Sequence, residues 1–278
     1  MSESAPSIGA KLRAIDFHPR TLSLVRPLTG PLTYLGWRVR GDRVPVYAFF
    51  DHTSRAIAYP LRFAVTTCRD WRGLQLTYDK HLGTDFIVPL GTPVTAAAKG
   101  VVLKVSEEPV GGPYLWVDHG GGFSTTYHHL SQVLVREGQE VARGEVIARS
   151  GGRGLAIESF FPLVPPHLHF GLVIDGVPAD PFPGPDSPGF WADGVDPRPY
   201  DFEQDLDLDL SYAGIEKREL LALFAEDEVL ASNFIPPMEV LAPEHLSYRG
   251  NWRALFDRPA LRLSLPFRAE EVRGIVYP

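Results

Sequence analysis

Residues 166–170 read Pro-His-Leu-His-Phe, and side chains that alternate in this way are typical of a β-strand. Successive side chains of a strand point to opposite faces, so the imidazoles of His167 and His169 point the same way. Their Cα atoms are then about 6.6 Å apart, at about 3.3 Å of rise per residue. This spacing suits one metal ligand and one neighbouring acid/base group.

Partners for such a ligand lie upstream, in the run His81-Leu82-Gly83-Thr84-Asp85. On a straight strand the backbones of His81 and Asp85 would be about 13 Å apart, too far for one ion with ligand distances of about 2 Å. We therefore predict a bend in this segment, which Gly83 permits. Two imidazoles and one carboxylate suit a borderline ion such as zinc and leave the fourth tetrahedral position open, as in catalytic sites.

A third candidate element is Thr125-Thr126-Tyr127-His128-His129-Leu130, which follows the turn-rich residues 120–122. In a strand, period two places Tyr127 and His129 on one face and His128 on the other. We therefore predict that only one of the adjacent histidines faces the site and that His128 points away from it. For Tyr127 we predict a packed aromatic side chain.

Together these segments resemble the signature of the lysostaphin-type (LytM-like) zinc metalloendopeptidases, which is a His-x-x-x-Asp motif, a Tyr-x-His-Leu segment and a terminal His-x-His. The matching residues, in the family's order along the chain, are His81 and Asp85, then Tyr127, His129 and Leu130, then His167 and His169. The flanks at 91–94 and 117–120 agree as well, so the resemblance covers roughly residues 75–182. It implies a mainly β fold, the duplicated hybrid motif, built from antiparallel sheet.

The resemblance also implies a division of labour: His81, Asp85 and His169 bind zinc (Zn²⁺), while His129 and His167 are catalytic. A bound zinc ion brings the pKa of its water to about 7. An unliganded imidazole, with an intrinsic pKa of about 6.5, can take the proton and return it to the leaving amine. The sequence has no His-Glu-x-x-His motif, so histidines must replace the glutamate base of that other design.

The sequence therefore predicts a zinc metalloendopeptidase, and the resemblance implies bacterial peptidoglycan as its partner, through stem peptides or cross-bridges. One alternative is a catalytically inert scaffold that keeps the fold and binds or activates a cell-wall enzyme. Another is a phosphocarrier with a related hybrid β fold, which also uses facing histidines but does not need Asp85. Bound zinc together with hydrolysis of peptidoglycan would distinguish the first reading from the other two.

Composition sets the wider limits. The chain has 278 residues, 44% of them hydrophobic and 22% charged, which is ordinary for a globular protein of one large or two modest domains. Its net charge of -7 argues against nucleic acid as a partner. No apolar run approaches the roughly 20 residues of a membrane helix. Cys68 is the single cysteine, which excludes an intramolecular disulfide, and the oligomeric state stays open.

The first ten residues lack the basic stretch and apolar core of a secretory signal. The family resemblance nevertheless implies a place outside the cytoplasm, in the periplasm or the cell envelope. The compartment is therefore left open by the sequence.

Three regions are expected along the chain: a β-rich region at 1–75, the zinc peptidase domain at 76–182, and a proline-rich linker with a partly helical extension at 183–278. The first should contain strands near 32–39 and 44–50, and it either completes the fold or covers the site as an inhibitory flap. The last should contain helices at 214–231 and within 238–256. The apolar stretch 155–166 either lines the substrate groove or packs into the core.

Overall fold

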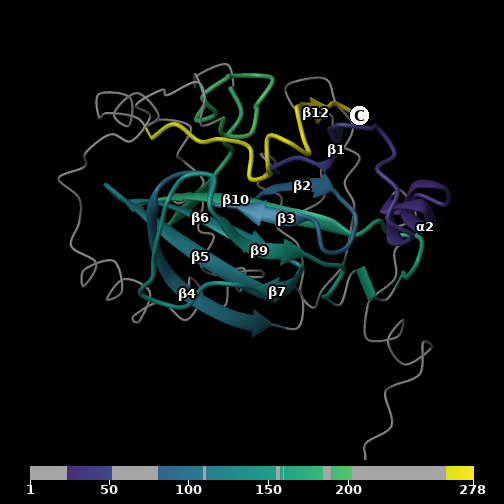
Figure 1. Ribbon diagram of the computed structural model, residues 1–278, viewed down its shortest axis with the longest axis horizontal. Helices are drawn as coiled ribbons and strands as arrows, with labels where there is room; N and C mark the ends of the chain where they lie inside the picture. Colours follow the sequence, from purple (N-terminus) through teal and green to yellow (C-terminus); the bar gives the residue numbers. More distant parts are fainter. Residues whose placement is uncertain are drawn as a thin grey trace, which may run out of the picture.

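The structure is a computed structural model that describes residues 24–51, 81–108, 111–154, 157–158, 160–183, 189–201 and 261–278. Its elements in chain order are α2 (Thr29–Tyr34), β1 (Arg43–Ala48), β2 (Thr84–Ile87), β3 (Pro93–Thr95), β4 (Gly100–Glu108), β5 (Gly112–Gly120), β6 (Phe123–His128), β7 (Leu130–Val133), β8 (Glu140–Val141), β9 (Val146–Ser150), β10 (His167–Ile174), β11 (Val177–Ala179) and β12 (Gly274–Val276). Strands dominate these residues (Figure 1), which confirms the predicted mainly β class.

The described strands form two sheets. The larger one has nine strands in the order β12-β1-β2-β10-β6-β5-β4-β8, with β11 paired to β10. Its pairs around β10 are antiparallel, whereas β1 and β12 run parallel. The smaller sheet has the order β3-β9-β7 and is antiparallel. One buried cluster contains residues of both sheets, so the two sheets pack face to face (Figure 1).

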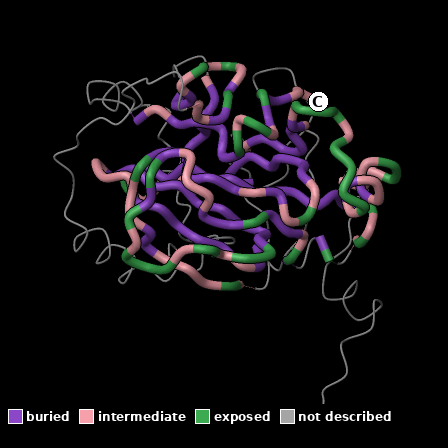
Figure 2. The backbone as a smooth tube through the Cα atoms, in the orientation of Figure 1, coloured by how far each residue is buried: buried purple, intermediate pink, exposed green. Residues whose placement is uncertain are grey.

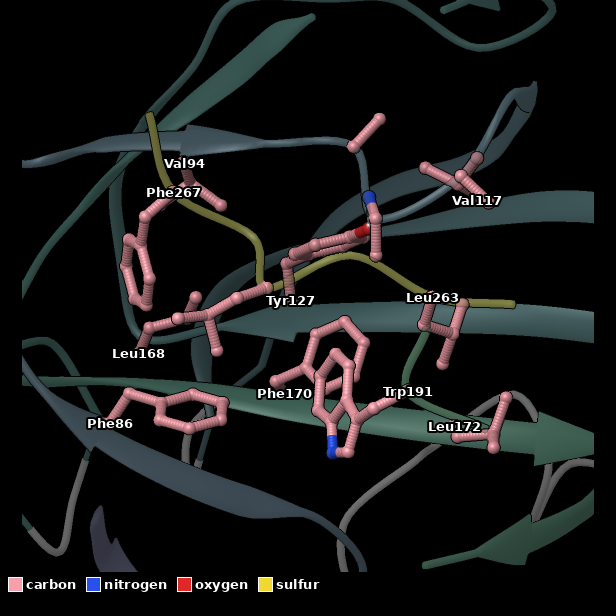
Figure 3. Packing of buried hydrophobic residues seen from close by; sticks show 14 of the residues in the cluster. Phe86, Val94, Val117, Tyr127, Leu168, Phe170, Leu172, Trp191, Leu263 and Phe267 are labelled. Carbon is pink, nitrogen blue, oxygen red and sulfur yellow. Dashed lines mark hydrogen bonds between the residues drawn. The ribbon is translucent and has the colours of Figure 1, made fainter. Parts of the chain in front are cut away.

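Strand β10 shows how the sequence pattern builds this packing. Leu168 and Phe170 lie in the main core and are fully buried, as is most of the central sheet (Figure 2). Phe170 stacks on Trp191 at 5.3 Å between ring centroids and meets Tyr127 edge-on at 5.5 Å (Figure 3). Burying each such side chain stabilises the fold by about 1.5–3 kcal/mol. Because successive side chains alternate, the same strand presents its histidines on the opposite face.

The core also takes in residues from outside the expected peptidase domain. Val46 on β1 pairs with Phe86 on β2, and Leu263 lies in the same cluster. Phe190 and Trp191 are 1% exposed, so at these two positions the expected surface linker enters the core. Large aromatic rings bury much apolar area, which outweighs the turn-forming residues around them. The boundaries at 75/76 and 182/183 stay predictions.

The first described segment differs in part from expectation. The strand predicted at 44–50 is present as β1, but the strand predicted near 32–39 is wrong, because 29–34 form helix α2 and the residues up to β1 form turns at 35–36 and 39–42. The Thr33 hydroxyl donates to the Thr29 carbonyl at 2.7 Å, a bond that competes with strand pairing. Gly36 has a φ of 91° and ends the helix in the left-handed region.

Some predictions lie outside the described residues. These are the helices at 214–231 and within 238–256, and the environment of Cys68. Within the described ranges, none of the helices has the length and apolar character needed to cross a membrane.

Candidate metal centre

Two neighbouring strands bring the predicted ligands together. Asp85 on β2 pairs directly with His169 on β10, so their side chains stand on the same face. His81 precedes β2, and the chain bends between it and Asp85, as predicted. A Cβ atom at Gly83 would lie 2.5 Å from His169 Nε2 and 2.5 Å from the Phe170 carbonyl oxygen. The bend therefore needs glycine for close approach as well as for flexibility.

The three side chains form a triangle of donor atoms. His81 Nε2 is 3.0 Å from Asp85 Oδ1 and 3.0 Å from His169 Nδ1, and the latter two atoms are 2.8 Å apart. All three residues are at most 1% exposed. Two ligands bound tetrahedrally at about 2.0–2.1 Å from one zinc ion are about 3.3 Å apart. The edges of this triangle are close to that value, so the residues present fit the ion.

Hydrogen bonding fixes which atoms face the centre of the triangle. His81 Nδ1 donates to the Phe49 carbonyl oxygen at 2.7 Å, because a carbonyl can only accept. This places the lone pair of His81 on Nε2, toward Asp85 and His169, and is the usual outer-shell support of a metal-binding histidine. A cation at the centre explains why three electron-pair donors converge.

The charge on Asp85 is consistent with this reading. Burial by itself would raise the pKa of Asp85. The neighbouring imidazoles of His81, His167 and His169 instead hold the pKa well below its usual value. The carboxylate is therefore ionised at neutral pH and available as a ligand.

His129 and His167, the predicted catalytic pair, stand beside the triangle. Their ring centroids are 4.8 Å apart, and the His129 ring is 6.1 Å from that of His169. His129 Nδ1 donates to the Arg153 carbonyl and His167 Nδ1 to the Pro165 carbonyl, both at 2.8 Å. Backbone carbonyls therefore select the same tautomer in both rings, which leaves each Nε2 with a lone pair.

His129 is neutral at neutral pH. Burial, and then the neighbouring His167 and His169, lower the pKa of His129 well below its usual value. His167 Nε2 lies 3.7 Å from Asp85 Oδ2. The two imidazoles thus have different partners on either side of the triangle.

The prediction for His128 is wrong. His128 ends β6 and pairs with His169, so it shares the face of the donor triangle, at 5.4 Å between ring centroids. The predicted alternation stops there because His129 has a φ of 58°, outside the strand range. Both adjacent histidines therefore face the site, which period-two reasoning could not predict. Tyr127, in contrast, is a packed aromatic as predicted, and its hydroxyl accepts a hydrogen bond from the Ala97 amide at 2.9 Å.

The described residues of segment 155–166 fill one of its two predicted roles, packing into the core, and the role in the substrate groove stays a prediction. Ile157 and Val164 are buried with Tyr47, whose ring lies 5.3 Å from that of His167. Phe161, in contrast, is 63% exposed. The segment is thus partly core and partly surface next to His167.

No motif predicted three further contributors to the site. These are the carbonyls of Phe49, Arg153 and Pro165, which orient imidazoles by their backbone. A backbone contact leaves no side-chain pattern in the sequence, so only the fold reveals it.

A buried triangle of two histidines and one carboxylate, with two more imidazoles beside it on an antiparallel sheet, is the arrangement of a metallopeptidase domain. Residues 79–181 match the model of peptidase family M23. The catalytic domain of the antimicrobial peptidase lysostaphin from Staphylococcus simulans is 30% identical, with 37% of this chain and 76% of that domain covered and a TM-score of 0.33. The segment 79–181 of this chain is therefore similar to the peptidase domain of family M23.

Two curated relatives carry names that describe an activity. The peptidoglycan DD-endopeptidase ShyA of Vibrio cholerae is 41% identical over 100 residues, which are 36% of this chain and 22% of that protein. The DD-carboxypeptidase/endopeptidase Mpg of Neisseria meningitidis is 36% identical over 105 residues, which are 38% of this chain and 23% of that protein. The chain spans about a fifth of the length of the curated relatives it matches.

Proposed function

We propose that the protein is a zinc metalloendopeptidase that hydrolyses peptide bonds in bacterial peptidoglycan, in stem peptides or in cross-bridges. The observation that carries the proposal is the buried triangle of His81, Asp85 and His169 with His129 and His167 beside it. The names of the relatives, both of them endopeptidases and one a peptidoglycan endopeptidase, support the substrate. Since peptidoglycan lies outside the cytoplasm, we place the activity in the periplasm or the cell envelope.

The zinc ion would be held by His81 Nε2, Asp85 Oδ1 and His169 Nδ1. When bound, zinc supplies Lewis acidity, which polarises a carbonyl group and lowers the pKa of water. Zinc is the ion of choice here because two imidazoles and one carboxylate form the ligand set of known catalytic zinc sites. The Phe49 carbonyl keeps the His81 ring in the ligating orientation.

The two remaining imidazoles perform the proton transfers. His129 Nε2 takes the proton of the water that attacks the peptide carbon, and it returns that proton to the leaving amine. Its neutral state at pH 7 makes it a competent acceptor. His167 Nε2 lies 3.7 Å from Asp85 Oδ2, and an imidazole at this position that takes up a proton during the reaction stabilises the negative charge that develops on the carbonyl oxygen.

Burial strengthens each of these interactions. The five side chains are between 0% and 4% exposed, so little solvent screens their charges. Oriented imidazoles in such surroundings pay no reorganisation cost during the reaction. The phosphocarrier alternative has no use for a buried carboxylate between two histidines, which makes Asp85 an argument against it.

The test has two parts. Elemental analysis of the purified full chain should give one zinc ion per molecule, and incubation with purified peptidoglycan should release peptides with new termini, identified by mass spectrometry. His129→Ala should keep the zinc and lose the products. Full zinc occupancy without any product from the wild type would instead favour the inert scaffold.

A further inference from the structure

The sheet face that carries the donor triangle extends beyond it, across β6, β5 and β4. Next to His169 on this face is His128, and the ring of Tyr114 on β5 stacks on His128 at 5.0 Å with 18° between the planes. Tyr114 belongs to a small buried cluster with Leu103, Trp116 and Val173, separate from the main core. This part of the sheet therefore has its own aromatic lining beside the metal centre.

Glu108, the last residue of β4, reaches the same place. Its Oε1 atom is 3.9 Å from His128 Nδ1, and its side chain is 15% exposed. Oε1 itself is buried, and within the described part of the chain no hydrogen bond reaches it. A buried carboxylate oxygen that accepts no hydrogen bond has lost its hydration without replacement, which is rare in native proteins and calls for a ligand.

The charges around Glu108 point to the nature of that ligand. Burial raises the pKa of Glu108 to about 7, although a hydrogen bond from the Gly111 backbone and the ammonium of Lys104 both lower it. The Lys104 ammonium lies over the Tyr114 ring, 5.8 Å from its centroid. The positive charge of Lys104 is thus too small to offset the rise in the pKa of Glu108 that burial causes. A cationic hydrogen-bond donor would offset it.

We propose that Glu108 and His128 form a subsite that binds an ammonium group of the peptide substrate, one side chain away from the metal centre. The proposal rests on the proposed function and names its substrate class: a peptide with a diamino acid or a free amino terminus near the scissile bond. An ammonium group has three donors, one of which bonds Glu108 Oε1, while the His128 ring lies within reach of a second. The neutral face of Tyr114 closes the subsite behind His128.

The experiment uses two synthetic peptides built around the bond that the wild-type chain cleaves in peptidoglycan. One carries lysine next to that bond, and the other carries Nε-acetyl-lysine, which has the same shape without the charge. We expect the wild type to prefer the lysine peptide by about 10-fold or more in kcat/KM, since a charge-assisted hydrogen bond is lost on acetylation. In Glu108→Gln the KM for the lysine peptide should rise about 10-fold with kcat unchanged, and the acetylated peptide should be cleaved as before.

The matched control is Glu140→Gln, which removes an exposed carboxylate from the edge strand β8 and should leave the preference intact. Zinc content and melting temperature establish that Glu108→Gln is folded and loaded. An equal loss on both peptides, or a wild type that does not distinguish them, overturns the subsite while leaving the proposed function in place. If the zinc-loaded wild type does not hydrolyse peptidoglycan, the proposed function fails, and calorimetric binding of a lysine-containing stem peptide and its Nε-acetyl-lysine counterpart still decides whether Glu108 recognises the ammonium group.

Discussion

The two faces of strand β10 obey different physical rules. On one face Leu168 and Phe170 pack into the main core, where apolar area and volume matter. On the other face His167 and His169 meet Asp85, where the positions of individual atoms matter to a few tenths of an ångström. One five-residue stretch thus serves stability through its even positions and chemistry through its odd ones.

The difference shows how the site is held. The ligands Asp85 and His169 face each other across a ladder pair, so the sheet register sets their separation. The core face fixes that register, because a slip by one residue would exchange histidines and apolar side chains. His81, His129 and His167 depend in addition on the backbone carbonyls of Phe49, Arg153 and Pro165, which orient their rings. The sheet register therefore fixes the separation of Asp85 and His169, whereas backbone hydrogen bonds set the orientation of the other three rings.

The largest effect is expected from Asp85→Ala on the site face. Removing the carboxylate takes the single negative charge from the donor triangle, so zinc should be lost from the purified protein and kcat/KM should fall by about 10³-fold or more. Elemental analysis and peptidoglycan hydrolysis measure the two quantities. Retention of stoichiometric zinc would show that Asp85 is no ligand.

His129→Ala separates the acid/base pair from the zinc ligands. We expect kcat to fall about 10²- to 10⁴-fold, the usual contribution of a general acid/base, while zinc content stays at the wild-type level. Single-turnover hydrolysis on zinc-loaded protein measures the loss. His128→Ala provides the neighbouring histidine for comparison, and an equal fall in kcat for both variants would contradict the assignment of His129.

Leu168→Ala tests the core face of the same strand. Because Leu168 is fully buried, the substitution should lower the free energy of unfolding by about 2–5 kcal/mol, measured by urea denaturation. At saturating zinc the folded fraction should still bind one ion, since the register survives the loss of one side chain. If Leu168→Ala instead lost zinc binding while its free energy of unfolding stayed unchanged, the core face and the site face of β10 would not act independently.

Gly83→Ala tests the bend that carries His81. The added Cβ would lie 2.5 Å from His169 Nε2, so the ring or the backbone must move. We expect zinc affinity to fall about 10- to 100-fold, as it does when the support of a ligand is disturbed, and the melting temperature of the zinc-free protein to fall as well, because the added Cβ also lies 2.5 Å from the Phe170 carbonyl oxygen. Competition with a fluorescent chelator gives the affinity. An unchanged affinity would show that the segment has more freedom than its packing indicates.

The smallest effect concerns His119, which contacts the core face through the Thr125 hydroxyl at 2.8 Å. Burial lowers the pKa of His119 from 6.5 to about 4. Below pH 6.5 the unfolded chain therefore binds a proton that the folded chain does not, and stability falls toward pH 4. In the zinc-free protein, the free energy of unfolding should fall between pH 7 and pH 5 by about 1–2 kcal/mol less in His119→Gln than in the wild type. Urea denaturation at each pH measures this difference. Parallel pH profiles for the two proteins would exclude this contribution.

The family resemblance implied the group of His81, Asp85 and His169, whose side chains lie together in the structure. Alternation and the reach of the chain were enough to predict the strand at 167–170 and the bend at Gly83. These features are local, since each follows from side-chain period or from the reach of the chain. The prediction placed only one of His128 and His129 on the site face, because it assumed that strand alternation continues through both. The positive φ of His129 ends the alternation, so both rings face the site. Histidine adopts a positive φ more often than most residues do. The presence of a histidine in the sequence nevertheless does not predict that its φ is positive.

The regions around the central domain were harder to predict for a different reason. Helix α2 and the buried Trp191 depend on what they pack against, which is far away in sequence. Propensity and composition describe a segment by itself, and tertiary contacts override them. The subsite around Glu108 belongs to the same class, because it joins the end of β4 to a histidine on β6.

The stacking of Trp191 on Phe170 means that the core of the family-matched segment 79–181 is completed by a residue outside it. Excising it would strip the indole and Leu263 from the apolar side of β10 and expose aromatic surface just behind His169. The flanking segments thus support strand β10, which carries His169, by packing against its apolar side. Substitutions far away in sequence, such as at Trp191 or Leu263, can therefore affect the position of His169 through one layer of packed side chains.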